Sequence, residues 1–251
     1  MKLKVISFNI RCLNDPNGYS RDERAPRILK VVEPYDADVI GLQEYIPAWE
    51  SHIEANFGDK YDIYNQYRCR EGWIESPPIL WKKDKFECIK QGCFWLSDTP
   101  EVESFGWDTI NHNRNCLYVI LKDKESGECF TFMNTHFGFG DEGQKKSAAL
   151  ICEYAKKISE LPTFVTGDFN ANPDTSAYAE MTSYFTDANA VTAKDWRSTF
   201  HAYDLEKETN EHIDYCFVDS RIKPLASHLM DETVDGKFPS DHFGLYTEIE
   251  L

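Results

Sequence analysis

The chain has 251 residues, enough for one large domain or two small ones. Its 27 Lys and Arg against 43 Asp and Glu give a formal net charge of −16, which argues against a general binder of long nucleic acid, because such proteins carry a basic surface. The longest uninterrupted apolar run, residues 116–121, is far shorter than the ~18 residues that cross a bilayer, so we expect no membrane span.

Short segments rich in β-branched and aromatic residues predict strands. In chain order they are residues 3–9, 39–43, 61–66, 79–82, 86–96, 115–122, 129–135, 164–167, 212–219 and 245–251. A helical period of apolar residues predicts helices at 24–33, 48–57 and 142–161, the last with Asp141 as its N-cap and Pro162 beyond its end. Many strands and few helices favour two packed sheets with helices outside them.

The cysteines and the lack of linker-like segments indicate the redox environment and the number of domains. Eight cysteines occur without CxxC spacing, which argues against zinc. The chain opens directly into KLKVISFNI, with no pattern of a signal peptide, so we expect free, mostly buried thiols and a cytoplasmic location. No repeat, low-complexity tract or Pro/Gly/Ser linker divides the chain, and we expect a single domain over residues 1–251.

Polar residues that suit metal and phosphate chemistry follow the predicted strands. Side chains at strand ends can converge on one rim of a sheet, where gathered carboxylates repel each other unless a cation lies between them. Oxygen ligands suit Mg²⁺, which leaves room for water and a substrate phosphate. The residues concerned are Asn9, Glu44, His136, Asp168, Asn170, Asp214, Asp241 and His242.

The motifs SFNI, LQE, NTH, GDFN, IDY and SDH occur in this order between residues 7 and 242. Together they resemble the endonuclease/exonuclease/phosphatase superfamily, and the block GCFWLSDTP is similar to one in small bacterial members near the deadenylase branch. The resemblance implies a four-layer α/β sandwich of two packed mixed sheets flanked by helices. It also implies a metal-dependent phosphoric ester hydrolase that uses Mg²⁺, with Mn²⁺ as a substitute.

Glu44 is the predicted metal ligand, with Asn9 and Asp241 close to the same ion. Asp168 is expected to take the proton of an attacking water, and Asn170 to donate to a phosphate oxygen. Arg114, by resemblance, contacts the phosphate as well, a role that suits its fork of donors.

The same resemblance pairs two histidines with carboxylates, His242 with Asp214 and His136 with Glu75. A carboxylate beside an imidazole raises its pKa and fixes its orientation. Whether His242 acts as a base or as an electrostatic stabiliser is left open by the sequence.

Other residues carry weaker signals. We expect solvated faces for the basic groups, and structural positions for three histidines. His201 and Trp107 are candidates for the cleft, whereas His212 stands where many relatives have an arginine. The basic groups are Arg68, Arg70, Lys82, Lys83, Lys85, Lys145 and Lys146, and the structural histidines are His52, His112 and His228.

The predicted substrate is compact: a nucleotide, a short single-stranded end or another small phosphoester, with no binding of long duplex DNA. A small-molecule phosphomonoesterase and a sphingomyelinase-type phosphodiesterase are the alternatives within the enzyme class. A catalytically silent binding protein is the alternative outside it. We expect specificity to lie in the loops 69–78, 111–115 and 137–143.

Overall fold

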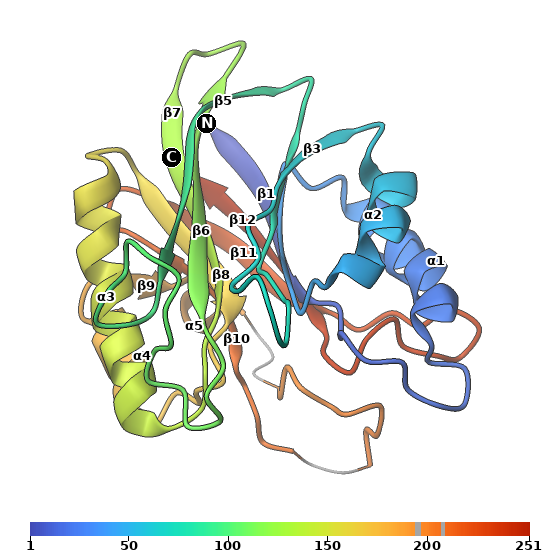
Figure 1. Ribbon diagram of the computed structural model, residues 1–251. Helices are drawn as coiled ribbons and strands as arrows, with labels where there is room; N and C mark the ends of the chain where they lie inside the picture. The colour runs from blue at the N-terminus through green and yellow to red at the C-terminus, as the bar shows by residue number, and fades with distance from the viewer. Residues whose placement is uncertain (194–196, 207–208) are drawn as a thin grey trace.

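The computed structural model describes residues 1–193, 197–206 and 209–251, and within them two six-stranded sheets pack face to face with helices on their outer faces (Figure 1). This is the predicted four-layer α/β sandwich. Both sheets are mixed, because each has one parallel strand pair at its centre and antiparallel pairs elsewhere.

The first sheet has the strand order β11-β12-β1-β2-β4-β3, in which only β1 and β2 pair in parallel among the described residues. Its strands are β1 (Lys2–Asn9), β2 (Val39–Gln43), β3 (Tyr61–Tyr64), β4 (Ile79–Lys82), β11 (Lys223–Met230) and β12 (Gly244–Glu250).

The second sheet has the order β5-β6-β7-β8-β10-β9, with β7 and β8 as its parallel pair. Its strands are β5 (Phe86–Trp95), β6 (Asn115–Asp123), β7 (Cys129–His136), β8 (Thr163–Asp168), β9 (Thr186–Asp187) and β10 (Asp214–Val218).

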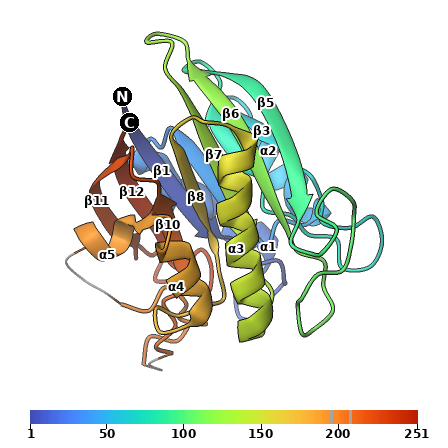
Figure 2. The same ribbon diagram turned by 90° about the vertical axis from the view of Figure 1, so that its left-hand side faces the viewer.

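Helices cover the two outer faces. α1 (Arg21–Val32) and α2 (Glu50–Phe57), with the 3₁₀ turns Glu33–Tyr35 and Pro47–Trp49, lie against the first sheet on the right of Figure 1. α3 (Asp141–Ile158) and α4 (Ser176–Thr182) lie against the second sheet, in front of it in Figure 2. The short α5 (Ala188–Thr192) contacts β10 and β11.

Apolar side chains fill the space between the sheets, but a polar link crosses it near the rim. Asn134 is fully buried on β7, and its Nδ2 donates to Leu42 O of the other sheet at 2.8 Å. Its Oδ1 accepts from Gln43 Nε2 at 2.9 Å. A Cβ at Gly41 would lie 2.5 Å from this oxygen, so only glycine allows the sheets to approach so closely here. The link fixes the relative position of the strand ends.

All the predicted strands and helices are present, with shifted ends. α1 begins at Arg21 rather than at residue 24, since Glu23 accepts a hydrogen bond from Ser20 N at 3.1 Å and completes a capping box. The N-cap of α3 is Gly140, with a φ of 100°, and the expectation of Asp141 as N-cap is wrong by one residue. The third strand stops at Tyr64 and the ninth predicted strand begins at Asp214.

The sequence reading missed β9, β11, α4 and α5. β11 opens with KPLAS, which has low strand propensity, and it contains Pro224 beside a bulge. It is the edge strand of the first sheet, where a proline is tolerated. The other three are short, at two, seven and five residues, and too brief for a periodic signal.

All eight cysteines are free, as predicted, and half of them are fully buried. Among the described residues no helix has the length and the hydropathy that a bilayer crossing requires.

Candidate active site

Four strands end at one rim of the sandwich because β1/β2 and β7/β8 are parallel pairs. Asn9 ends β1 opposite Gln43, and Glu44 follows directly. His136 ends β7 opposite Asp168, which ends β8. The carboxyl ends of these strands therefore bring polar side chains from both sheets to the same place.

The antiparallel strands β10 and β12 begin at that rim. Asp214 opens β10 and pairs with Asp168, while Asp241 and His242 precede β12. Ser240 Oγ donates to Asn9 O at 2.6 Å and ties this segment to the end of β1. Residues more than 200 positions apart thus meet at one site.

A cavity of about 460 Å³ opens at this rim. Most of the predicted site residues line it, and Asn9 and Asp214, both fully buried, lie beneath its floor. The predicted residues on its wall are Glu44, Glu75, Arg114, His136, Asp168, Asn170, Asp241 and His242.

Asp168 lies at the centre of this group. Its Oδ2 accepts from Asn9 Nδ2 at 2.9 Å and lies 3.6 Å from His136 Nε2 and 3.8 Å from His242 Nε2. Its Oδ1 accepts from the backbone N of Asn170 at 2.9 Å. The carboxylate therefore faces both imidazoles while an amide and a backbone N–H hold it in place.

Both predicted carboxylate-imidazole contacts are present. His136 Nδ1 lies 2.8 Å from Glu75 Oε1, and His242 Nδ1 lies 2.9 Å from Asp214 Oδ2. Burial opposes a charge on His242, but the carboxylates of Asp214, Asp168 and Asp241 outweigh it and raise the pKa of His242 to about 10. At neutral pH this ring is an imidazolium, a donor at both nitrogens.

Glu75 is held by more than its histidine. Its Oε2 accepts from Trp73 Nε1 at 3.0 Å and lies 3.3 Å from Arg68 Nη2, while Arg114 Nη1 lies 3.7 Å from Oε1. Burial favours the neutral acid, yet His136, Arg68 and Arg114 keep the pKa of Glu75 well below its usual range. The expectation of a solvated Arg68 is wrong, since this side chain is buried beside Glu75.

Glu44 and Asp241 form an acidic cluster, and the charges of His242 and Arg11 offset the effect of burial on Asp241 only in part. Glu44 Oε1 accepts from Asn9 Nδ2 at 3.1 Å, and its Oε2 from Cys12 N at 2.8 Å. Arg11 forms an ion pair with Asp241, with Nε 3.4 Å from Oδ2. Burial raises the pKa of Asp241, and the charge of Glu44 adds to this effect. Hard oxygen ligands that repel each other fit a divalent cation.

Ligand atoms of Asp168, Asp214 and His242 also lie within 4.8 Å of one another. This set fits a metal less well, because Asp214 Oδ2 already lies 2.9 Å from His242 Nδ1, and a metal would have to displace that contact. Glu44, Asn9 and Asp241 are the other residues at this rim that could hold a divalent cation.

A turn, and not strand geometry, positions Asn170 relative to Asp168. Extended backbone ends at Asp168, and Asn170 has a φ of 47°, so the two side chains do not share a face through strand geometry. Instead the backbone N of Asn170 donates to Asp168 in an Asx turn, and Nδ2 donates to Phe137 O at 3.0 Å. Asn170 still lines the cavity.

Arg114 is buried, and Asp108 orients it. Its Nε donates to Asp108 Oδ2 at 2.9 Å, whereas Nη1 has no hydrogen-bond partner within the described part of the chain. Nη1 lies 3.7 Å from Glu75 Oε1, so the guanidinium is held between Asp108 and Glu75 at the cavity wall.

The sequence reading missed the first loop as part of the site. Arg11 and Cys12 line the cavity, and Arg24 of α1 holds their loop by donating to Arg11 O at 2.9 Å and to Leu13 O at 2.7 Å. A buried arginine in a predicted helix gives no sequence signal of this role. Trp49 Nε1 adds a donor to Arg11 O at 3.1 Å.

Several expectations about aromatic and histidine residues are wrong. Trp73 and His112 line the cavity, although His112 was expected to be structural. Trp107 lies away from the cavity wall and donates to Asp98. His201 is buried among Phe residues outside the lining. His212 contacts Arg197 O through Nδ1 at 2.8 Å and has no place on the wall.

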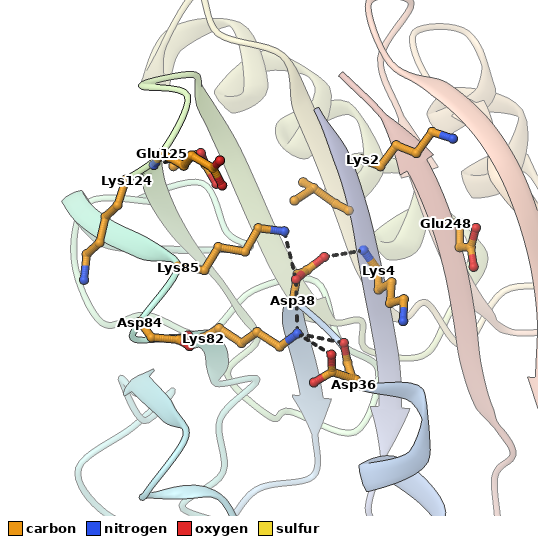
Figure 3. A pocket seen from close by; sticks show the side chains of 12 residues that line it. Lys2, Lys4, Asp36, Asp38, Lys82, Asp84, Lys85, Lys124, Glu125 and Glu248 are labelled. Atoms are coloured by element: carbon orange, nitrogen blue, oxygen red, sulfur yellow. Dashed lines mark hydrogen bonds and ion pairs between the residues drawn. The ribbon is translucent and has the colours of Figure 1, made fainter.

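A larger cavity, of about 620 Å³, lies at the opposite end of the sheets (Figure 3). Its buried carboxylate, Asp38, accepts from Lys85 Nζ at 3.0 Å, Lys82 Nζ at 3.3 Å and Lys4 N at 2.9 Å. The expectation of free, solvated lysines is wrong for Lys82 and Lys85. The ammonium groups of Lys82 and Lys85 therefore neutralise the buried carboxylate of Asp38.

A sequence model of the Endonuclease/Exonuclease/phosphatase family matches residues 6–242, so the chain belongs to this family. Enzymes of the family hydrolyse phosphoesters and typically depend on a divalent metal.

Solved structures agree with this assignment. A family protein from Bacteroides thetaiotaomicron has 29% identity and a TM-score of 0.91, covering 100% of this chain and 99% of that one. A mannosyl-6-phosphatase from the same species has 30% identity and a TM-score of 0.89, covering 99% and 100%. The human Nocturnin catalytic domain, from the deadenylase branch, shares the fold at 16% identity and a TM-score of 0.80, covering 99% and 93%.

Proposed function

We propose that this protein is a Mg²⁺-dependent hydrolase of a small phosphoester, with Mn²⁺ as a substitute. The observation that carries the proposal is the position of Asp168, between two carboxylate-paired imidazoles and next to the acidic cluster of Glu44 and Asp241. A silent binding protein would have no need to keep this whole set.

The ion would be held by Glu44, with Asn9 and Asp241 close by, and when bound it supplies positive charge that neutralises the phosphate oxygens. Asn9 adds no charge, and its amide links Glu44 to Asp168. If the ion binds Asp241, the ion pair between Arg11 and Asp241 must either break or persist beside the ion.

Asp168 orients the attacking water and accepts its proton, because Asn9 and the backbone of Asn170 fix the direction of its carboxylate. His242, protonated at neutral pH, donates from Nε2 to a phosphate oxygen instead of acting as a base. His136, which Glu75 orients, faces the phosphate from the other side, and the guanidinium of Arg114 lies on the same wall. His242, His136 and Arg114 stabilise negative charge that grows on the phosphate during in-line attack.

The dimensions and charge of the cavity favour a compact substrate. Its wall carries Glu44, Glu75, Asp168, Glu211 and Asp241, which would repel the successive phosphates of a nucleic-acid chain. The sugar phosphatase at 30% identity supports a phosphomonoester of a sugar over a nucleotide end or a phosphodiester.

The test is turnover of three esters with Mg²⁺, Mn²⁺ or chelator: mannose 6-phosphate, bis-para-nitrophenyl phosphate and a short single-stranded oligonucleotide. We expect mannose 6-phosphate to be hydrolysed with the highest kcat/KM, and chelator to abolish the activity. Full activity in excess chelator, or no turnover of any ester with either metal, would contradict the proposal.

A further inference from the structure

A second cavity, of about 370 Å³, adjoins the active site and shares Trp73 and His112 with it. The two rings lie parallel, at 9° and with centroids 6.3 Å apart. We call this cavity the Trp73 pocket and define it by Arg68, Trp73, Glu103, Phe105, His112 and Asn113. A ligand whose phosphate lies beside Asp168 could reach it by passing this pair of rings.

Two buried side chains of the Trp73 pocket each have one polar atom without a hydrogen bond among the described residues. Arg68 and Asn113 are 2% and 6% exposed, and within the described residues Arg68 Nη1 donates no hydrogen bond and Asn113 Oδ1 accepts none. An unpaired buried group of this kind costs about 1–3 kcal/mol. An unused donor and an unused acceptor on residues that line one pocket fit hydroxyl groups, which can both accept and donate.

Nearby groups restrict the ligand further. Trp73 is 45% and Phe105 71% exposed, so both rings offer apolar surface to the face of a ring-shaped ligand. Glu71 and Glu103 also line the cavity and disfavour a second phosphate there. The pocket therefore suits a neutral, hydroxylated ring with one apolar face.

We propose that the Trp73 pocket binds the sugar ring of a sugar phosphate and thereby sets the specificity of the enzyme. Asn113 accepts from a sugar hydroxyl, Arg68 donates to one, and Phe105 packs on the ring. This assignment rests on the proposed function, because a phosphate beside Asp168 determines where the sugar is directed. Trp73 also donates to Glu75, so a ring bound against it contacts the network that orients His136.

The experiment compares mannose 6-phosphate with methyl phosphate, which is too small to enter the Trp73 pocket. We expect Asn113→Ala and Phe105→Ala each to raise KM for mannose 6-phosphate three- to tenfold more than KM for methyl phosphate, since one hydrogen bond or ring contact contributes about 1 kcal/mol. Val102→Ala is the matched control: this side chain is 57% exposed near Phe105 but outside the pocket, and it should leave both KM values unchanged.

Equal changes of KM for the two esters would overturn the proposal and make these residues merely structural. A separate measurement distinguishes failure of the pocket from failure of the proposed function. If the protein hydrolyses neither ester, saturation-transfer NMR with methyl α-mannoside still reports on the pocket. Sugar signals that fall in Asn113→Ala but persist in Val102→Ala support the assignment, whereas no signal with the unmodified protein, or equal signals in both variants, refutes it.

Discussion

Each end of the sandwich buries an aspartate, but the charged groups around the two aspartates differ. Asp38, at the end near the termini, is 6% exposed and has three donors from lysine residues. Asp168 is 2% exposed at the other end and has two imidazoles at 3.6 and 3.8 Å, with the carboxylates of Glu44 and Asp241 close by.

The difference shows that the balance of charge, rather than the size of a cavity, marks the functional end. The larger cavity surrounds a neutralised network, while the smaller one contains carboxylates in excess. Buried ion pairs of the first kind hold a structure together only while both partners remain. Excess charge of the second kind opposes folding and is useful when a cation or a transition state balances it.

The largest expected difference between the ends is in activity. Asp168→Asn should lower turnover of the best phosphoester by at least ~10²-fold, because it removes the group that accepts the proton of the water. Asp38→Asn should leave kcat/KM within twofold. Steady-state kinetics with saturating Mg²⁺ measures both, and circular dichroism checks that each variant is folded. A comparable loss of activity in both variants would contradict the proposal that only the Asp168 end of the sandwich is catalytic.

The next largest effect concerns metal binding. Mg²⁺ or Mn²⁺ at 100 times its Kd should stabilise the protein by about 2.7 kcal/mol, since a ligand that binds only the folded state stabilises it by mass action. Glu44→Gln should lose most of this rise in Tm, and Lys85→Met, at the opposite end, should retain it. Differential scanning fluorimetry with and without chelator gives the answer. A full metal-dependent rise in Glu44→Gln would exclude Glu44 as a ligand.

Without metal, stability should change in opposite directions at the two ends. Asp38→Asn should cost about 1–3 kcal/mol, as it removes the negative charge that Lys85, and in part Lys82, pairs with. Asp241→Asn should raise the free energy of unfolding at pH 7, because burial raises the pKa of Asp241 and its ionisation therefore opposes folding.

The sign of this effect also predicts its pH dependence. The pKa of Asp241 is higher in the folded protein than in the unfolded chain. Its effect on the free energy of unfolding is therefore most favourable at a pH below the unfolded-state pKa, and this favourable effect is lost as the pH rises through the folded-state pKa. The advantage of Asp241→Asn should therefore be large at pH 7 to 8 and shrink toward pH 4. Urea unfolding in chelator measures it, and an advantage that grows as pH falls would contradict the assignment.

The smallest effect is expected at Asp36, near Asp38. The hydrogen bond with Lys60 has the largest effect on the pKa of Asp36. Together with Lys82, it lowers this pKa to about 2. The stabilisation is therefore present above the ordinary value of 3.8 and lost as pH falls toward 2. Because the side chain is 53% exposed, Asp36→Asn should cost less than about 1 kcal/mol at pH 7 and still less in 1 M salt. Urea midpoints at pH 7 and pH 3.5 test the trend.

Much of the active end could be predicted because its side chains follow buried strands. Asn9, Glu44, His136 and Asp168 each come after an apolar segment, and parallel strands end at the same rim. The order of six motifs then identified the family. Strand ends are a local property of the sequence, so a single chain suffices to find them.

The loops around the cavity could not be predicted in this way. Trp73 reaches the site because Glu75 accepts from its indole, and Arg11 because the buried Arg24 holds its carbonyl. Such contacts depend on tertiary packing between loops and helices. The sequence pattern did not predict β11 for a different reason. This edge strand contains Pro224 and is stabilised by pairing with β12 and not by its own strand propensity.

Three residues on the cavity wall, Arg11, Glu44 and Asn170, have left-handed backbone, with φ of 58°, 60° and 47°. Glycine adopts this conformation without strain, whereas other residues pay of order 1 kcal/mol, asparagine least. Laboratory evolution for thermal tolerance alone would therefore drift toward glycine at Arg11 and Glu44 and discard a cation and a carboxylate. Screening for heat resistance and turnover together would keep both side chains.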